Sequence, residues 1–224
     1  MMERPQLVQE EDGLKLVGSG MTLMADFREM LPRIKQSNLE RELLVKAARI
    51  KSTPQGTRLH VLDATAGFGE DSLLLAAAGF QVELYEYDAV IAALLRDALV
   101  RAEKLPQLAE TVARMTLHEE SSIEAMQRLA ALPREELPEV IYLDPMFPER
   151  KKSGMIGKKF QLLQRLEQPC DDEAALFDAA KGLKPKKLIV KRPLKGPYLA
   201  GEKPDYGYEG KAIRYDCYVR FSQL

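Results

Sequence analysis

The chain of 224 residues is longer than a typical domain of about 150 residues, so we interpret it as one large domain with a small appendage. Hydrophobic residues make up 46% and charged residues 30% of it, which excludes a disordered chain because a sizeable core can be buried. Lys and Arg number 33 against 34 Asp and Glu, a net charge of −1. This balance excludes a globally basic nucleic-acid-binding protein, although a local basic face stays possible.

Residues that bind metals or form disulfides are scarce. The two cysteines, Cys170 and Cys217, form no CxxC pair, and the histidines are His60 and His118 alone. We therefore expect neither a disulfide framework nor a metal site. No apolar run approaches the length of a membrane span, and the first residues do not resemble a signal peptide. The expected protein is cytoplasmic, with no membrane contact.

The first predicted elements precede a turn-rich break at residues 52–56. They are a strand-like stretch at residues 14–24 and a helix at residues 38–50, whose apolar side chains recur near helical spacing. We expect residues 1–36 to form a small N-terminal appendage and residues 37–224 to form the main domain.

Strands and helices alternate after the break. Strands are predicted at residues 59–63, 81–86, 115–119, 139–144 and 187–191, and helices at 71–78, 88–104, 122–132 and 171–181. Short apolar strands that alternate with helices are typical of a parallel sheet covered on both faces. We predict a doubly wound, mostly parallel α/β fold, with an antiparallel strand over residues 211–221 at its edge.

A glycine loop follows the first of these strands, in the run Asp63-Ala64-Thr65-Ala66-Gly67-Phe68-Gly69. Ligands of doubly wound sheets bind at the carboxyl ends of the strands, and glycines let the backbone approach a ligand closely. A short glycine pattern of this kind also occurs in ordinary turns between a strand and a helix. We nevertheless take Asp63, Gly67 and Gly69 as candidates for cofactor binding.

Acidic residues around this loop indicate the kind of cofactor. Glu86 ends the second strand, where a carboxylate can bind both hydroxyls of a ribose. A dinucleotide site would have a third glycine where Ser72 stands, and Glu70-Asp71 would repel a pyrophosphate. A cofactor with a cationic end, such as S-adenosylmethionine (SAM), suits the loop better. This favours a methyltransferase over a nicotinamide-dependent oxidoreductase.

The fourth strand ends in Asp144-Pro145-Met146-Phe147-Pro148. This run resembles the loop with which methyltransferases bind planar exocyclic amines. The lone pair of such an amine is delocalised into the ring, so the amine must be oriented towards the methyl group. The Asp144 carboxylate and the Pro145 carbonyl could accept its N–H groups, and Phe147 could stack on the base. A proline-rich loop with Phe147 in the core is the structural alternative.

Basic residues flank this loop on both sides in the expected fold. A stretch after the loop and another from Lys181 to Lys195 could line a rim that binds RNA phosphates. Each stretch could equally be a solvated face. The candidate RNA-binding residues are Arg150, Lys151, Lys152, Lys191 and Arg192.

At this point the sequence resembles the RsmJ-type small-subunit ribosomal RNA guanine-N2 methyltransferases. The resemblance rests on residues 63–71, 89–95, 140–148, 151–153, 190–193 and 214–216, and on the methionine of the DPMFP run. It implies a Rossmann-like class I methyltransferase fold and methyl transfer from SAM to a guanine N2 of 16S rRNA. It also implies cofactor contacts at Glu70, Asp71, Glu86, Tyr87, Ser121, Ser122 and Asp144. The resemblance begins near residue 38, and the first 35 or so residues differ from the family.

Two other functions stay open from the sequence. The chain could methylate another planar amine, such as adenine N6 or a glutamine amide. It could also be a catalytically silent RNA-binding factor of ribosome assembly, although binding alone does not require the DPMF run. The sequence does not predict the modified nucleotide or the oligomeric state.

Overall fold

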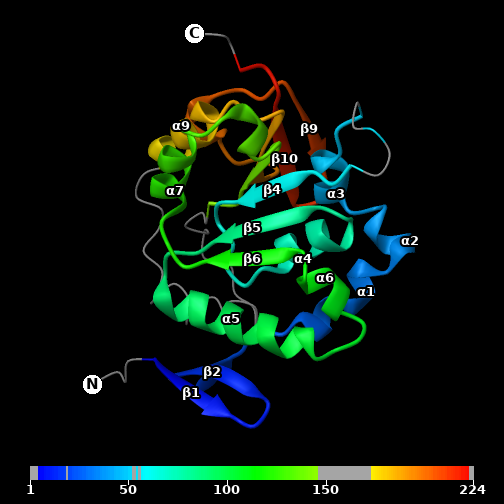
Figure 1. Cartoon of the computed structure of the whole chain (residues 1–224), viewed down its shortest axis with the longest axis vertical. Coiled ribbons are helices and arrows are strands. Elements are labelled where there is room, and N and C mark those ends of the chain that lie inside the picture. Colours follow the sequence, from blue (N-terminus) through cyan, green and yellow to red (C-terminus); the bar gives the residue numbers. More distant parts are fainter. Residues whose placement is uncertain (1–4, 19, 52–53, 55–56, 146–172, 222–224) are drawn as a thin grey trace.

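The computed structural model describes residues 5–18, 20–51, 54, 57–145 and 173–221 (Figure 1). A seven-stranded sheet with the order β6-β5-β4-β7-β8-β10-β9 forms its centre. The strands are β4 (His60–Asp63), β5 (Gln81–Tyr85), β6 (Met115–His118), β7 (Val140–Leu143), β8 (Lys187–Pro193), β9 (Tyr206–Glu209) and β10 (Ile213–Tyr218).

Five of these strands are parallel. The chain first adds strands on one side of β4 and then on the other side. From β4 it moves outward to β5 and β6, and it then returns to β7 on the other side of β4. The carboxyl ends of β4 and β7 therefore flank the switch point at which such sheets bind ligands. Strand β10 is antiparallel to β8 and to β9. The doubly wound, mostly parallel fold is confirmed.

Alternate residues of the central strands enter two different cores. Val61 and Tyr142 belong to the larger core, whereas their neighbours Leu62 and Ile141 belong to the smaller one, as the two-residue period of a strand requires. The larger core includes side chains of α3 (Leu43–Ala48), α4 (Glu70–Ala77), α5 (Ala89–Glu103) and α6 (Ala109–Val112). The smaller core includes those of α7 (Ser122–Leu129) and α9 (Glu173–Gly182). Helices thus cover both faces of the sheet.

Polar side chains fix the beginnings of two helices. Asp88 caps α5 by accepting hydrogen bonds from the backbone N–H groups of Val90 and Ile91. Ser121 caps α7 by accepting one from Glu124 N at 3.4 Å. Among the helices of the described residues, none combines the length and the apolar character that crossing a bilayer requires.

Two predicted elements after residue 36 differ in the structure. The helix expected at residues 38–50 is interrupted: α2 (Gln36–Leu39) and α3 are separate because Glu42 has an extended backbone and accepts hydrogen bonds from Arg33. The expected edge strand, β10, lies inside the sheet, since β9 pairs with its outer side. Strand β9 is not predictable from the sequence, because most of its residues are exposed and show no apolar run.

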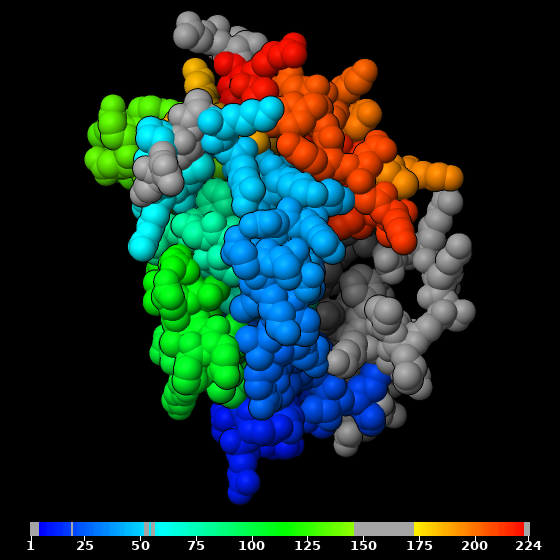
Figure 2. All heavy atoms as spheres, turned by 90° about the vertical axis from the view of Figure 1, so that its right-hand side faces the viewer, coloured from blue at the N-terminus to red at the C-terminus, as the bar shows by residue number. Residues whose placement is uncertain are grey.

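The N-terminal residues form a second, three-stranded antiparallel sheet of β1 (Gln6–Glu10), β2 (Gly13–Gly18) and β3 (Met21–Leu23). The stretch predicted as one strand at residues 14–24 is therefore split between two strands. This sheet lies beside α5 (Figure 1). The chain continues through η1 (Phe27–Met30) and α1 (Leu31–Ile34), which contact α4, and this segment runs in blue along the face shown in Figure 2.

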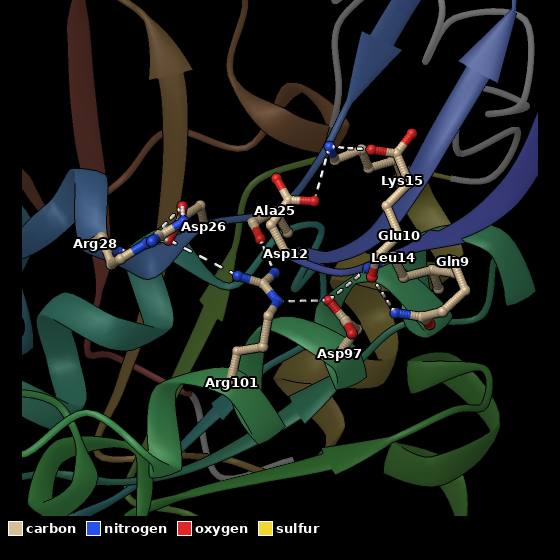
Figure 3. A network of polar contacts seen from close by, with 10 residues as sticks. All are labelled: Gln9, Glu10, Asp12, Leu14, Lys15, Ala25, Asp26, Arg28, Asp97 and Arg101. Atoms are coloured by element: carbon tan, nitrogen blue, oxygen red, sulfur yellow. Dashed lines mark hydrogen bonds and ion pairs between the residues drawn. The ribbon is translucent and has the colours of Figure 1, made fainter.

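A polar network attaches the small sheet to α5 (Figure 3). Asp97 accepts hydrogen bonds from Leu14 N at 3.1 Å and from Arg101 Nε at 2.7 Å. The Arg101 guanidinium also donates to the Ala25 carbonyl and lies 3.9 Å from Asp26 Oδ1. Arg101 therefore links α5 to the segment between β3 and η1.

Candidate cofactor and amine site

The loop after β4 is tied to both neighbouring strands. Ala64 N donates to the Tyr142 carbonyl at 3.0 Å, and Ala66 N donates to the Tyr85 carbonyl at 3.1 Å. The two glycines of the loop have positive φ angles, 54° at Gly67 and 73° at Gly69, which favour glycine. The loop is thus held at the switch point of the sheet.

The surroundings of the two glycines differ. Among the atoms of the described residues, a Cβ on Gly67 would meet none within 4 Å, whereas a Cβ on Gly69 would lie 2.7 Å from Leu95 Cδ1. Only Gly67 therefore offers open backbone that a ligand can approach. Gly69 is closely packed, and its N–H donates a hydrogen bond to the Ala66 carbonyl; its predicted contact with the cofactor stays a prediction.

Glu86 at the end of β5 lies against this open backbone. Its Oε2 accepts a hydrogen bond from Gly67 N, and its Oε1 accepts one from Asp88 N, both at 2.9 Å. Burial raises the pKa of the Glu86 carboxyl. These contacts fix the orientation of the carboxylate beside the glycine loop. Tyr87, the next residue, is 61% exposed.

Asp63 is buried beneath the same loop. Its Oδ2 accepts a hydrogen bond from Ser72 Oγ at 2.6 Å, and its Oδ1 accepts one from Thr65 N at 3.1 Å. Burial raises the pKa of Asp63 to about 7. Asp63 thereby joins the end of β4 to the first turn of α4, and its predicted contact with the cofactor stays a prediction.

A second polar cluster lies at the end of β7. Lys191 Nζ lies 2.7 Å from Asp144 Oδ2 and 2.7 Å from Asp71 Oδ2. The buried Tyr142 hydroxyl donates to the same Asp71 oxygen at 2.6 Å. Asp144 N donates to Thr65 Oγ1 at 2.6 Å. The glycine loop, α4, β7 and β8 therefore meet around the Asp144 side chain.

Burial controls the titration of this cluster. It raises the pKa of Asp144, although the charge of Lys191 acts in the opposite direction. It also raises the pKa of Tyr142 and of Tyr215, with a further contribution from the charge of Asp71. The carboxylates raise the pKa of Lys191 and outweigh its own desolvation. Lys191 is therefore a cation at neutral pH.

Two of the predicted RNA-binding residues make their contacts with protein groups. Lys191 is held between two carboxylates. The Arg192 side chain is only 1% exposed; it donates to the Pro197 carbonyl at 2.9 Å and pairs with Glu173 at 3.5 Å. Both cations are thus engaged by protein groups, which argues against the predicted phosphate contacts. The patterns of charge in the sequence did not show that these side chains point inward.

The remaining predicted residues divide into two sets. Pro145 is buried directly after Asp144, Glu70 is exposed at the start of α4, and Ser122 is buried in the first turn of α7. Phe147, Arg150, Lys151 and Lys152 lie outside the described residues. Within the described ranges, no group of three His, Cys, Asp or Glu side chains is arranged to hold a metal ion.

Thr65 and Tyr142 are two residues of the site that the sequence patterns did not indicate. Thr65 binds Asp144 N, and Tyr142 binds Asp71. The available signal was a tyrosine within a fully apolar strand, because a buried tyrosine hydroxyl usually requires a hydrogen-bond partner.

Comparisons with known proteins agree with this arrangement. Residues 2–220 match the model of a family described as "Putative SAM-dependent methyltransferase". A protein of Neisseria meningitidis named ribosomal RNA small subunit methyltransferase J is 37% identical over 217 residues, which cover 96% of this chain and 84% of the relative. A Pseudomonas fluorescens protein of the same name is 44% identical over 173 residues, covering 77% of this chain and 65% of the relative.

A solved structure is also similar. The crystal structure of a SAM-dependent methyltransferase from Neisseria gonorrhoeae has a TM-score of 0.76 and 32% sequence identity. The alignment covers 96% of this chain and 82% of that one. The matches include the N-terminal residues, which the sequence analysis had placed outside the resemblance.

Proposed function

We propose that this chain, which belongs to the SAM-dependent methyltransferase family that includes the proteins named ribosomal RNA small subunit methyltransferase J, methylates the N2 atom of a guanine in small-subunit ribosomal RNA. The observation that carries the proposal is the Asp144 side chain, which contacts Lys191 at the end of β7 next to the glycine loop. The names of the relatives support ribosomal RNA as the substrate. Modification of this RNA would take place in the cytoplasm.

The cofactor is SAM, and the residues of the loop fit it. Gly67 leaves space for a ligand against its backbone. The fixed carboxylate of Glu86 can accept hydrogen bonds from ribose hydroxyls. The acidic side chains around the loop suit the positive charges of the methionine end. When bound, SAM supplies an electrophilic methyl carbon.

The residues after β7 would bind the guanine. Its N2 amine is a weak nucleophile, so its orientation supplies much of the rate. In the proposed complex, the Asp144 carboxylate and the Pro145 carbonyl accept the two N–H groups and aim the nitrogen lone pair at the methyl carbon. The N–C bond forms as the S–C bond breaks, and the cationic nitrogen then releases a proton that Asp144 can accept.

The base must leave its stack to reach this position, and a flipped base requires hydrogen-bond acceptors and an aromatic surface. We propose Phe147 for the stacking contact. We propose Arg150, Lys151 and Lys152, which follow it in the chain, for contacts with RNA phosphates.

The direct test is incubation with SAM labelled in its methyl group and small-subunit rRNA that lacks the modification. We expect one labelled nucleoside, N2-methylguanosine, after digestion of the RNA. Label on adenine N6 or on a protein glutamine would identify a different amine substrate. RNA binding without any transfer would identify a silent assembly factor. Either outcome would contradict the proposal.

A further inference from the structure

The ion cluster around Lys191 joins the cofactor helix to the predicted base-binding residue. Asp71 lies in the first turn of α4, Asp144 follows β7, and Lys191 belongs to β8. The Lys191 side chain is 23% exposed, and its ammonium group lies 2.7 Å from one oxygen of each carboxylate. The contact with Asp144 uses Oδ2, so Oδ1 can serve a substrate.

The opposite end of the cluster is firmly held. Asp71 Oδ2 accepts a second hydrogen bond, from the Tyr142 hydroxyl, and Tyr142 is buried in the centre of the sheet. Lys191 therefore connects Asp144 to a fixed carboxylate rather than to solvent. Such an arrangement restricts the torsion angles of the Asp144 side chain.

The same arrangement determines the charge of Asp144. Two carboxylates that share a site disfavour each other's ionisation, whereas an ammonium group between them favours it. An ionised carboxylate only accepts hydrogen bonds, but a protonated one also donates. A protonated Asp144 would present an O–H group to an amine that itself donates.

We propose that Lys191 is a positioning residue for methyl transfer: it orients the Asp144 carboxylate and keeps it anionic, so that Asp144 can accept an N–H group of the target amine. This inference rests on the proposed function, because it assigns Asp144 the role of acceptor. It replaces the predicted contact of Lys191 with an RNA phosphate. The role of Lys191 is indirect, since it acts through Asp144.

Charged and titratable groups surround the cluster on several elements. They are Asp63 on β4, Asp71 on α4, Tyr142 on β7, Arg192 on β8, Tyr215 on β10 and Arg33 on α1. Among these, Asp71 is the anion that shares Lys191 with Asp144. Removal of Lys191 would therefore leave two neighbouring carboxylates with no cation between them.

The first experiment requires no RNA. Protein labelled with ¹³C at the aspartate carboxyl carbons is titrated by NMR, and the Asp144 signal is identified by its loss in Asp144→Asn. We expect the midpoint of the Asp144 titration to rise by about one to three pH units in Lys191→Met, the usual effect of a neighbouring opposite charge. Lys191→Arg keeps the charge and should keep most of the wild-type midpoint. An unchanged midpoint in Lys191→Met would overturn the inference.

The second experiment measures kcat for rRNA methylation against pH, at saturating SAM and RNA. In Lys191→Met, the acid limb of the profile should move to higher pH by the same amount, so that kcat falls most on the acid side of the profile. Adding Asp71→Asn to Lys191→Met removes the second carboxylate and should move the acid limb back towards the wild-type position. A purely structural role for Lys191 would lower kcat at every pH and leave the limb in place, which would contradict the inference.

Lys186→Met is the matched control. Lys186 lies just before β8, is exposed and pairs with Glu139 at 3.6 Å, so its removal should change neither the titration nor the profile. The two experiments also separate the two proposals. If wild-type protein does not methylate rRNA but the Asp144 titration shifts as expected, the proposed substrate is wrong and the control of the Asp144 charge by Lys191 stands. If methylation occurs and neither the titration nor the limb moves, the role of Lys191 is wrong.

Discussion

The Phe27 ring lies 3.2 Å from the position that a Cβ on Gly69 would occupy. Phe27 belongs to the N-terminal segment, and Gly69 belongs to the cofactor loop. The N-terminal segment therefore packs directly beneath this loop. Together with the contacts of η1 and α1 with α4, this packing makes the segment part of the support for the site.

Substitution of the two loop glycines by alanine should have different effects on stability. Both variants strain the left-handed backbone, which costs about 1–2 kcal/mol. Gly69→Ala also forces a methyl group against Leu95 and Phe27, and such overpacking costs about 1–3 kcal/mol more. Urea unfolding should therefore show the greater loss for Gly69→Ala, whereas Gly67→Ala should chiefly weaken SAM binding. Equal losses of stability would contradict this account.

The polar network of Figure 3 gives a prediction about the N-terminal sheet. Arg101→Met removes the hydrogen bonds to Ala25 and Asp97, and we expect a loss of about 1–3 kcal/mol in the free energy of unfolding. Cleavage by a protease within β1 to β3 should become faster. The matched control is Arg96→Met on the same helix, because Arg96 is exposed and its pair with Glu119 contributes at most about 1 kcal/mol. Equal cleavage rates in the two variants would show that the network does not hold the sheet.

The raised pKa of Asp63 predicts how stability depends on pH. The folded protein holds the Asp63 proton up to pH about 7, whereas the unfolded chain loses it near the ordinary value of 3.8. Between these values the folded state binds more protons, so the contribution of Asp63 to stability falls as the pH rises and is constant above pH about 7. Asp63→Asn cannot titrate. The unfolding free energy of the wild type minus that of Asp63→Asn should therefore decrease from pH 5 to pH 8. A constant difference would contradict the assignment.

The sequence predicted the site best where a residue's role follows from its position at a strand end. Asp63, Glu86 and Asp144 end three neighbouring strands, and the carboxyl ends of parallel strands meet at one edge of a sheet. The sequence did not indicate that Lys191 and Arg192 contact protein groups, because charge patterns do not show side-chain direction. Lys191 points to the face of the larger core, like Ile189 two residues earlier. The helix break at Glu42 was not predictable either. Glu42 has an extended backbone, and its carboxylate accepts a hydrogen bond from Arg33, nine residues earlier, a contact that the local sequence pattern does not indicate.

Glu86→Ala should weaken SAM binding without abolishing the fold. The substitution removes the acceptor for the ribose hydroxyls and also the contacts that hold Gly67 N and Asp88 N. We expect a loss of about 1.5–3 kcal/mol in binding free energy, the scale of hydrogen bonds to a charged group, measured by calorimetry. Glu110→Ala is the control, since Glu110 is an exposed acid on α6 that pairs with Arg114. Unchanged affinity in Glu86→Ala would remove Glu86 from the cofactor site.

Asp144→Asn tests the chemistry itself. The amide keeps the size of the side chain and one accepting oxygen, but it loses the negative charge that stabilises the cationic nitrogen formed during transfer. Loss of a group placed for the transition state costs about 10²–10³ in rate. The ion pair with Lys191 is also lost, and SAM affinity can fall with it, so kcat must be measured at saturating SAM and RNA. Methylation of guanine N2 at the wild-type rate under these conditions would make Asp144 a structural residue and would refute the proposed mechanism.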